Sequence, residues 1–88
     1  MHATKTLRTP GGKAVEIDLG CIELIEDLWA NGVATVSCCQ GTDPPPVAHV
    51  SLGRGQNVEL AREVISHHVT INEELLDVGC PTFYWEVR

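Results

Sequence analysis

The stretch Thr35-Val36-Ser37-Cys38-Cys39-Gln40-Gly41 decides how this chain folds, because it closes an apolar run that begins directly after Asn31-Gly32. An Asn-Gly pair supplies the left-handed residue at which many helices end. The alternation of side chains over 33–39 then predicts a strand with successive residues on opposite faces. The stretch therefore marks a junction from helix to strand, and it places two thiols, an amide and a glycine at the rim of a sheet.

The residues before this junction predict a strand followed by a helix. Period-two alternation over 14–17 is typical of a half-buried strand, and Asp18 is a suitable N-cap for a helix that begins directly after it. The helix is predicted over 19–31, where apolar side chains recur along one face at Cys21, Ile22, Ile25, Leu28 and Trp29. Residues 1–13 are expected to form an extended N-terminal arm or an edge strand, with a turn at Pro10-Gly11-Gly12.

The residues after the junction predict a loop, a strand and a second helix. Three successive prolines make 41–46 a loop, because proline has no backbone N–H to donate to a sheet. Alternation predicts a strand over 47–52, and Asn57 is the expected cap of a helix over 58–69. The side chains expected to face the core from these two elements are Ala48, Val50, Leu52, Ala61, Val64, Ile65 and His68.

In the last part of the chain, the secondary structure is ambiguous over 70–81 and clearly predicted over 83–87. Residues 70–81 are ambiguous, with Asn72 as the candidate cap of a short extra turn through Val78. Large alternating side chains over 83–87 predict the final strand. At least one of its three aromatic residues is expected to face away from the helices.

This order of elements predicts the fold. Strand, helix, strand, strand, helix, strand over 1–88 favours a single α+β domain, since 88 residues are too few for two hydrophobic cores. Short connections and right-handed crossovers favour the ferredoxin-like split βαβ sandwich. In it, two helices cover one face of a four- to five-stranded antiparallel sheet.

The opposite face of that sheet is the candidate site. The side chains expected there are Glu16, Thr35, Ser37, Cys39, His49, Ser51, Tyr84 and Glu86, whereas Ala34, Val36 and Cys38 are expected on the core side. A slip of one residue would exchange the two sets. Such a face is either a binding platform or a surface that is solvated or packed in a dimer.

Composition limits the classes of function. The chain is 43% apolar and 20% charged, which is typical of a globular protein, and its net charge of −6 argues against a nucleic-acid partner. No apolar stretch approaches the roughly 20 residues that span a bilayer, and no signal-peptide core is evident, so a cytoplasmic location without membrane contact is expected. The positions of the four cysteines favour free thiols.

Three patterns point to possible chemistry. Cys39 with His49 suggests a nucleophile, because a nearby imidazole can take the proton of a thiol. A metal site is not expected, since adjacent residues on a strand, such as Cys38 and Cys39, point to opposite faces. Gly53-Arg54-Gly55 opens onto a helix N-terminus, where free N–H groups and a guanidinium favour an anion.

The segment over 15–41 resembles a group of small, mostly uncharacterised phage and actinobacterial proteins that carry a T-x-x-S-C-Q-G strand end. The matching residues are Asp18, Leu28, Trp29, Gly32, Thr35, Cys39, Gln40 and Gly41, and Cys38 stands where the motif has serine. The resemblance implies a phage or actinobacterial origin. It also implies an accessory role, such as an inhibitor of host defence in the host cytoplasm, with a host protein or a nucleotide signal as its partner.

The expected function is therefore a small non-enzymatic binding module, forming a homo-oligomer, that holds a small anionic, nucleotide-like ligand without cofactor or metal. The expected ligand-binding residues are Ser37, Cys39, Gln40, Gly41, His49, Arg54 and Tyr84, with Lys13 and Arg8 from the basic N-terminal segment. One alternative is a protein-binding inhibitor or adaptor that acts through the open sheet face. Another is a Cys39-dependent enzyme.

Overall fold

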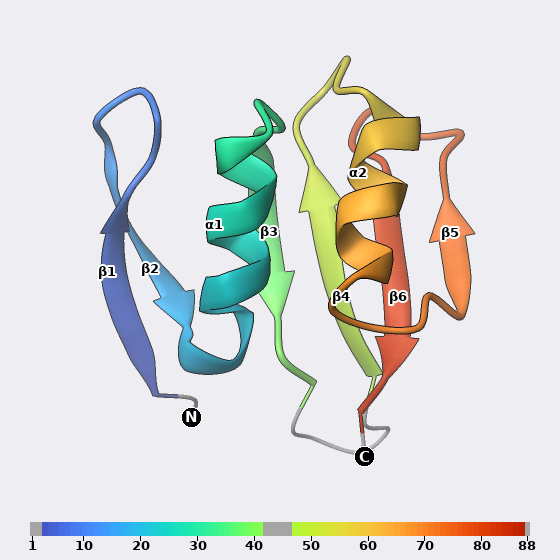
Figure 1. The fold of residues 1–88 in the computed structure, drawn as a ribbon, viewed down its shortest axis with the longest axis horizontal. Helices are drawn as coiled ribbons and strands as arrows, with labels where there is room; N and C mark the ends of the chain where they lie inside the picture. The colour runs from blue at the N-terminus through green and yellow to red at the C-terminus, as the bar shows by residue number, and fades with distance from the viewer. Residues whose placement is uncertain (1–2, 42–46, 88) are drawn as a thin grey trace.

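The computed structural model describes residues 3–41 and 47–87, which form two helices on a small sheet beside a separate hairpin (Figure 1). The elements in chain order are β1 (Thr4–Arg8), β2 (Ala14–Asp18), the 3-10 helix η1 (Leu19–Cys21), α1 (Ile22–Ala30), β3 (Thr35–Cys39), β4 (Val47–Leu52), α2 (Val58–Ser66), β5 (Glu73–Leu75) and β6 (Thr82–Glu86).

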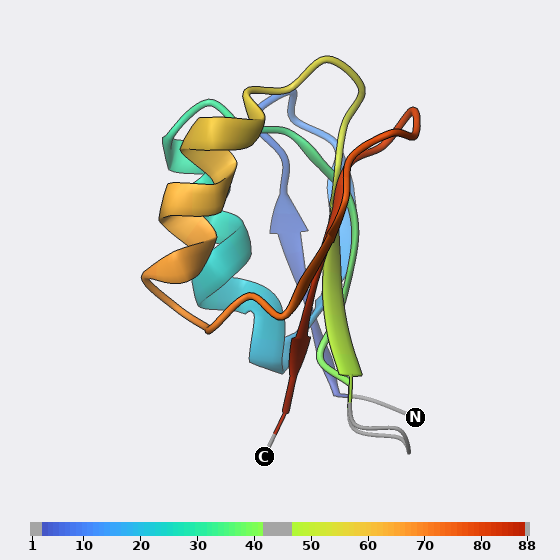
Figure 2. The same cartoon turned by 90° about the vertical axis from the view of Figure 1, so that its right-hand side faces the viewer.

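The main sheet has four antiparallel strands in the order β3-β4-β6-β5, and α1 and α2 both lie on one of its faces (Figure 2). The chain is thus an α+β protein with two helices on one face of an antiparallel sheet, as predicted. The ferredoxin-like arrangement is not confirmed, because it requires the strand at 14–18 within this sheet. That strand is β2, and it pairs with β1 in a second sheet of two strands.

The hairpin of β1 and β2 forms because its turn closes locally. The Gly12 N–H donates to the Thr9 carbonyl oxygen at 2.8 Å, and the Thr9 N–H donates to the Lys13 carbonyl oxygen at 2.8 Å. The pairing then runs from Arg8 opposite Ala14 to the far end of the hairpin. The Thr-rich segment is therefore extended, as predicted, and the hairpin lies beside α1 (Figure 1).

The hydrophobic core lies between the two helices and the main sheet. Its buried residues include Leu24, Ile25, Leu28, Val33, Ala48, Val50, Leu52, Ala61, Val64, Ile65, Phe83 and Trp85. The predicted core faces of β4 and α2 are confirmed except at His68, which is exposed and bonds to Asp27. Along α1, the spacing predicted that Ile22 faces the core. Ile22 is only half-buried, and Leu24 is buried instead. No helix in the described parts of the chain is long and apolar enough to cross a bilayer.

An irregularity in β3 overturns part of the predicted alternation. Thr35 pairs with Leu52 and Ser37 pairs with Ser51, so the register shifts between Thr35 and Ser37. This extra residue is a β-bulge, which turns the strand locally. Thr35 therefore shares the helix-side face of Leu52, where its Oγ1 accepts the Trp29 indole N–H at 3.1 Å. Val36, expected in the core, is 60% exposed, and Ala34 is also exposed.

The ambiguous region over 70–81 contains a strand and not the extra helical turn. Asn72 does not cap a helix, because its N–H donates to the Tyr84 carbonyl oxygen at 2.9 Å and its Oδ1 accepts the Glu86 N–H at 2.6 Å. These two bonds place the next residues along β6, where they form β5. Asn57 does cap α2, and its Oδ1 accepts the Leu60 N–H at 3.0 Å.

Candidate functional site

The candidate site is the face of the main sheet opposite the helices, which we call the open face. The register aligns two rows of side chains across the four strands. The first row is Cys39, His49, Tyr84 and Glu73, and the second is Ser37, Ser51, Thr82 and Leu75. Val47 and Glu86 are paired beyond the first row and lie on the same face, since side chains alternate along β4 and β6.

Three groups in the first row lie next to one another. Cys39 and His49 are direct cross-strand partners, and so are His49 and Tyr84. The rings of His49 and Tyr84 are tilted by 47°, with their centroids 6.1 Å apart. Opposed residues in antiparallel strands have Cβ atoms about 5 Å apart, so the thiol, the imidazole and the phenol form one continuous surface.

The second row is organised by hydroxyl groups. Ser51 Oγ and Thr82 Oγ1 lie 2.8 Å apart in a hydrogen bond, and Thr82 Oγ1 also donates to the Cys80 carbonyl oxygen at 3.0 Å. These bonds satisfy the polar groups near the centre of the face. Val47 and Leu75, at its margins, are 38% and 46% exposed. The open face is therefore polar and ordered at its centre and partly apolar at its edges.

The sequence predicted most of this face. Ser37, Cys39, His49, Ser51, Tyr84 and Glu86 lie on it as expected. Glu16 does not, because it lies in the separate hairpin, where its Oε1 accepts from Thr4 Oγ1 at 3.4 Å. Thr35 does not, because of the bulge. Thr82 was missed although alternation from Tyr84 reaches it, and no pattern in 70–81 indicated Glu73 and Leu75.

Gln40 and Gly41 lie at the end of β3, where they join elements of the chain to one another. Gln40 Oε1 accepts the Gly20 N–H at 2.8 Å, and the Gln40 N–H donates to Asp18 Oδ2 at 3.3 Å. Asp18, predicted as an N-cap, makes no side-chain cap bond to η1. Gly41 is buried with φ +67°, and a Cβ atom there would lie 2.5 Å from the Val47 carbonyl oxygen. Its close backbone approach is thus to β4.

Arg54 is not brought to this site. It follows the end of β4, five residues beyond His49, which corresponds to about 16 Å along an extended strand. Its guanidinium lies against the loop before β6, since a Cβ atom at Gly79 would be 2.9 Å from Arg54 Nη2. The proline residues 44–46, expected beside the site, lie outside the described residues.

The two basic residues of the hairpin are also elsewhere. Arg8 and Lys13 flank the turn between β1 and β2, and Arg8 Nη1 donates to the Gly12 carbonyl oxygen at 2.9 Å. The two rows of the open face hold no lysine or arginine, and their charged members are acidic. The expected grouping of cations around Cys39 and His49 is therefore not found within residues 3–41 and 47–87.

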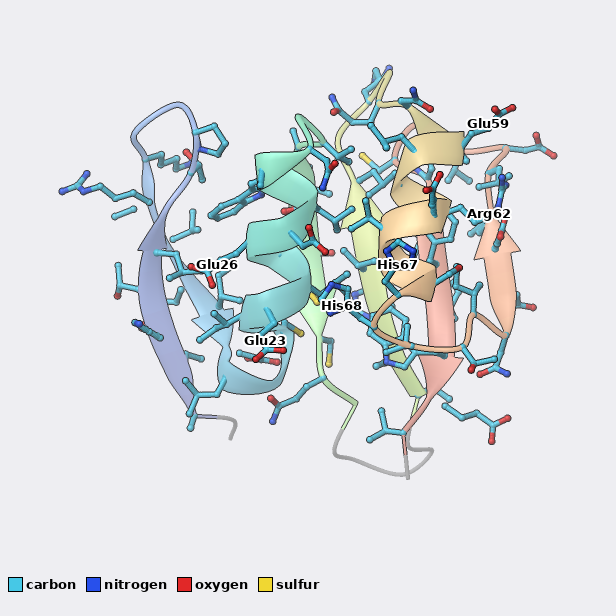
Figure 3. All side chains as sticks on the ribbon, in the orientation of Figure 1. Glu23, Glu26, Glu59, Arg62, His67 and His68 are labelled. Carbon is cyan, nitrogen blue, oxygen red and sulfur yellow. The ribbon has the colours of Figure 1, made fainter. Side chains whose placement is uncertain are left out.

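The outer surface of the helices is acidic as well. Figure 3 shows Glu23 and Glu26 on α1, and Glu59, Arg62, His67 and His68 along and just after α2. Arg62 is neutralised by Glu74, with Nε–Oε2 and Nη2–Oε1 distances both 2.7 Å. His68 Nε2 lies 2.8 Å from Asp27 Oδ2 and so connects the end of α2 to α1. This surface offers little to an anion.

Two further thiols meet inside the core. Cys21 is buried at the end of η1, and Cys38 packs against the core cluster from β3. A hydrogen bond from the Cys38 thiol lowers the pKa of Cys21, and the same interaction together with burial raises the pKa of Cys38. Of the two thiols, Cys21 is therefore the one that is more readily deprotonated.

Neither a metal-binding cluster nor a match to known proteins helps to identify the function of the open face. Within residues 3–41 and 47–87, no group of three His, Cys, Asp or Glu side chains could hold a metal ion. Comparisons of the chain with protein-family models, curated proteins and solved structures found no match.

Proposed function

We propose that this chain is a small protein-binding module whose open face docks a partner protein. The observation that carries the proposal is the uncovered first row, in which Cys39, His49 and Tyr84 lie side by side on the face that neither helix covers (Figure 2). Tyrosine is enriched among the residues that dominate binding at protein interfaces. The hydroxyl pair of Ser51 and Thr82 adds a rigid polar centre beside it.

The charges on this face indicate the kind of partner. Glu73 and Glu86 are exposed on the open face, the chain has a net charge of −6, and no cation stands in its two rows. A flat surface with an acidic margin fits a neutral to basic protein surface. It does not favour the nucleotide-like anion that the glycine-flanked arginine suggested.

The size and the charge of the face together indicate the kind of complex. Four strands of three to six residues, spaced by about 4.8 Å, give a face of at most about 15 by 17 Å, or about 250 Å². A standard stable interface buries about 800 Å² on each partner. The open face alone is therefore too small for a stable complex with any partner. Its acidic margin would also repel the same face of a second copy, so we propose a transient complex with a different protein.

Site-specific photo-crosslinking tests this proposal. A benzophenone amino acid at position 84 is expected to capture a protein that the same group at position 59, on α2, does not capture. Binding of that purified partner should then weaken roughly tenfold or more with Tyr84→Ala and stay unchanged with Glu59→Gln. Equal capture from positions 84 and 59, or purified binding that is indifferent to Tyr84→Ala, would overturn the proposal.

A second candidate function is thiol-dependent catalysis, which the direct pairing of Cys39 with His49 favours. The imidazole would take the thiol proton and so generate the nucleophile. This function requires that iodoacetamide alkylates Cys39 faster than Cys80 and that His49→Gln slows the reaction at Cys39. Slow labelling that does not discriminate between Cys39 and Cys80 would exclude it.

A further inference from the structure

The buried pair of Cys21 and Cys38 carries an inference that is independent of the open face. Both thiols are reduced in the structure, and Cys21 is 1% exposed. Cys38 projects into the same core cluster from β3, where its register partner is the fully buried Val50. A side-chain hydrogen bond joins the two thiols, so the sulfurs of η1 and β3 are in direct contact.

Hydrogen bonds join the two segments of the chain that hold these cysteines. The Gly20 N–H, one residue before Cys21, donates to Gln40 Oε1 at 2.8 Å, and the Gln40 N–H donates to Asp18 Oδ2 at 3.3 Å. Gln40 is two residues after Cys38. These bonds hold η1 against the end of β3 and so keep the two cysteines near each other. A disulfide requires such closeness, because its two Cα atoms must lie within about 7 Å.

One of the two cysteines lines a groove at the surface of the molecule. A groove of about 280 Å³ runs between β2 and β3, and Cys38 is among its lining residues together with Val15, Ile17 and Val36. Cys21 lies deeper, at the start of α1, where the N-terminal end of a helix stabilises a thiolate. The cysteine that lines the groove and the cysteine that is the better thiolate are therefore different residues. This division suits a pair in which Cys38 forms a mixed disulfide with an oxidant and Cys21 displaces the oxidant.

We propose that Cys21 and Cys38 are a redox-modification site that forms an intramolecular disulfide with a small disulfide oxidant. The thiolate of Cys21 takes the Cys38 proton through their hydrogen bond as the sulfur of Cys38 attacks one sulfur of the oxidant. The oxidant's S–S bond breaks, and the first small thiolate leaves and takes that proton from Cys21. The thiolate of Cys21 then attacks Cys38 Sγ, the S–S bond of the protein forms, and the second small thiolate leaves and is protonated by solvent. Two protein thiols are oxidised, one small disulfide is reduced to two thiols, and each released thiol takes one proton.

Oxidation has a defined structural effect. The new bond closes the loop from 21 to 38 around α1, and such loops stabilise a fold mainly by restricting the unfolded chain. The expected change is a rise in Tm on the order of 10 °C. Disulfides that form in reducing compartments are usually transient, as this reversible bond would be.

Peptide mapping of the oxidised chain tests the proposal. Full-length protein is treated with oxidised glutathione, blocked with an alkylating reagent and cleaved after glutamate. The cleavage separates 17–23, which holds Cys21, from 27–59, which holds Cys38 and Cys39, and from 75–86, which holds Cys80. The expected product is a disulfide between the first two peptides, with fragmentation that assigns Cys38, together with a rise in Tm that dithiothreitol reverses.

Variants separate the pairings. The linked product and the rise in Tm should persist in Cys39→Ser and Cys80→Ser and be lost in Cys38→Ser. Persistence in Cys38→Ser would assign the bond to Cys39, and glutathione retained on the chain without a link would show that the two core thiols do not react together. Either result would overturn the proposal. The fragment assignment in the unmutated chain holds even where a serine variant fails to fold.

Discussion

At the scale of single residues, Gly41 shows how a strand end is fixed. Its φ of +67° lies in the left-handed region, and the nearest atoms to an added Cβ are the Val47 carbonyl group and the Ala48 nitrogen, at 2.5 to 2.6 Å. Gly41→Ala should therefore lower the free energy of unfolding by about 2–4 kcal/mol, from backbone strain and a clash together. Urea unfolding measures the loss.

Gly55 is the matched control for that substitution. Its φ of +76° is similar, but no atom lies within 4 Å of its added Cβ. Gly55→Ala should cost only about 1 kcal/mol, from the left-handed backbone alone. Equal losses at positions 41 and 55 would show that the contact with Val47 is not what requires glycine.

At the scale of elements, α1 is held at both ends by glutamine side chains. Gln40 Oε1 accepts the Gly20 N–H before the helix, and Gln56 Oε1 accepts the Ala34 N–H after it, both at 2.8 Å. Gln40→Ala and Gln56→Ala should each cost about 1 kcal/mol. In amide exchange, the first variant should expose the Gly20 N–H and the second the Ala34 N–H, so each serves as the control for the other. Loss of protection at both amides in either variant would contradict the claim that the two hydrogen bonds act independently.

The contact between α2 and β5 should depend on pH. The Arg62 guanidinium binds Glu74 through two bonds of 2.7 Å, and this lowers the pKa of Glu74 from its ordinary value of 4.5. A carboxyl whose folded pKa is depressed stabilises the fold above its ordinary pKa and loses that effect as the pH falls through its folded pKa. The stability difference between wild type and Glu74→Gln should therefore be largest near neutral pH and disappear in acid.

An NMR titration checks the cause of that dependence. The midpoint for the Glu74 carboxyl should lie below the ordinary glutamate value and move upward in Arg62→Gln, whereas Arg62→Lys should move it less. A midpoint that does not respond to either substitution would contradict the assigned ion pair.

At the scale of the whole molecule, local patterns predicted the elements better than their assembly. The stripes of α1 and α2 and the alternation of β4 and β6 identify both faces of the main sheet, because burial on one face imposes those periods. The turn at 10–12 was predicted, but local patterns do not show that β2 pairs with β1 alone and stays outside the main sheet. The bulge in β3 has no sequence signal, and it alone moved Thr35 and Val36.

The candidate site shows the same division. Cys39, His49 and Tyr84 could be grouped from alternation, because each lies in a regular part of its strand. Arg54, Arg8 and Lys13 could not be placed, because Arg54 lies in a turn, Arg8 and Lys13 flank another turn, and the direction of each turn depends on tertiary contacts. The acidic character of the chain was predicted from its composition, but the distribution of its few cations depends on the fold.

One NMR experiment with a soluble gadolinium chelate tests the open face most directly. The ring signals of His49 and Tyr84 should be broadened by the chelate and show nuclear Overhauser contacts to each other and, for His49, to the Cys39 side chain. The rings of Phe83 and Trp85 should stay sharp, because they are 0% and 7% exposed. The opposite result, in which the chelate broadens the Phe83 ring and leaves the His49 and Tyr84 rings sharp, would contradict the account. It would mean that the strand register is shifted by one residue, so that the proposed docking face is part of the core.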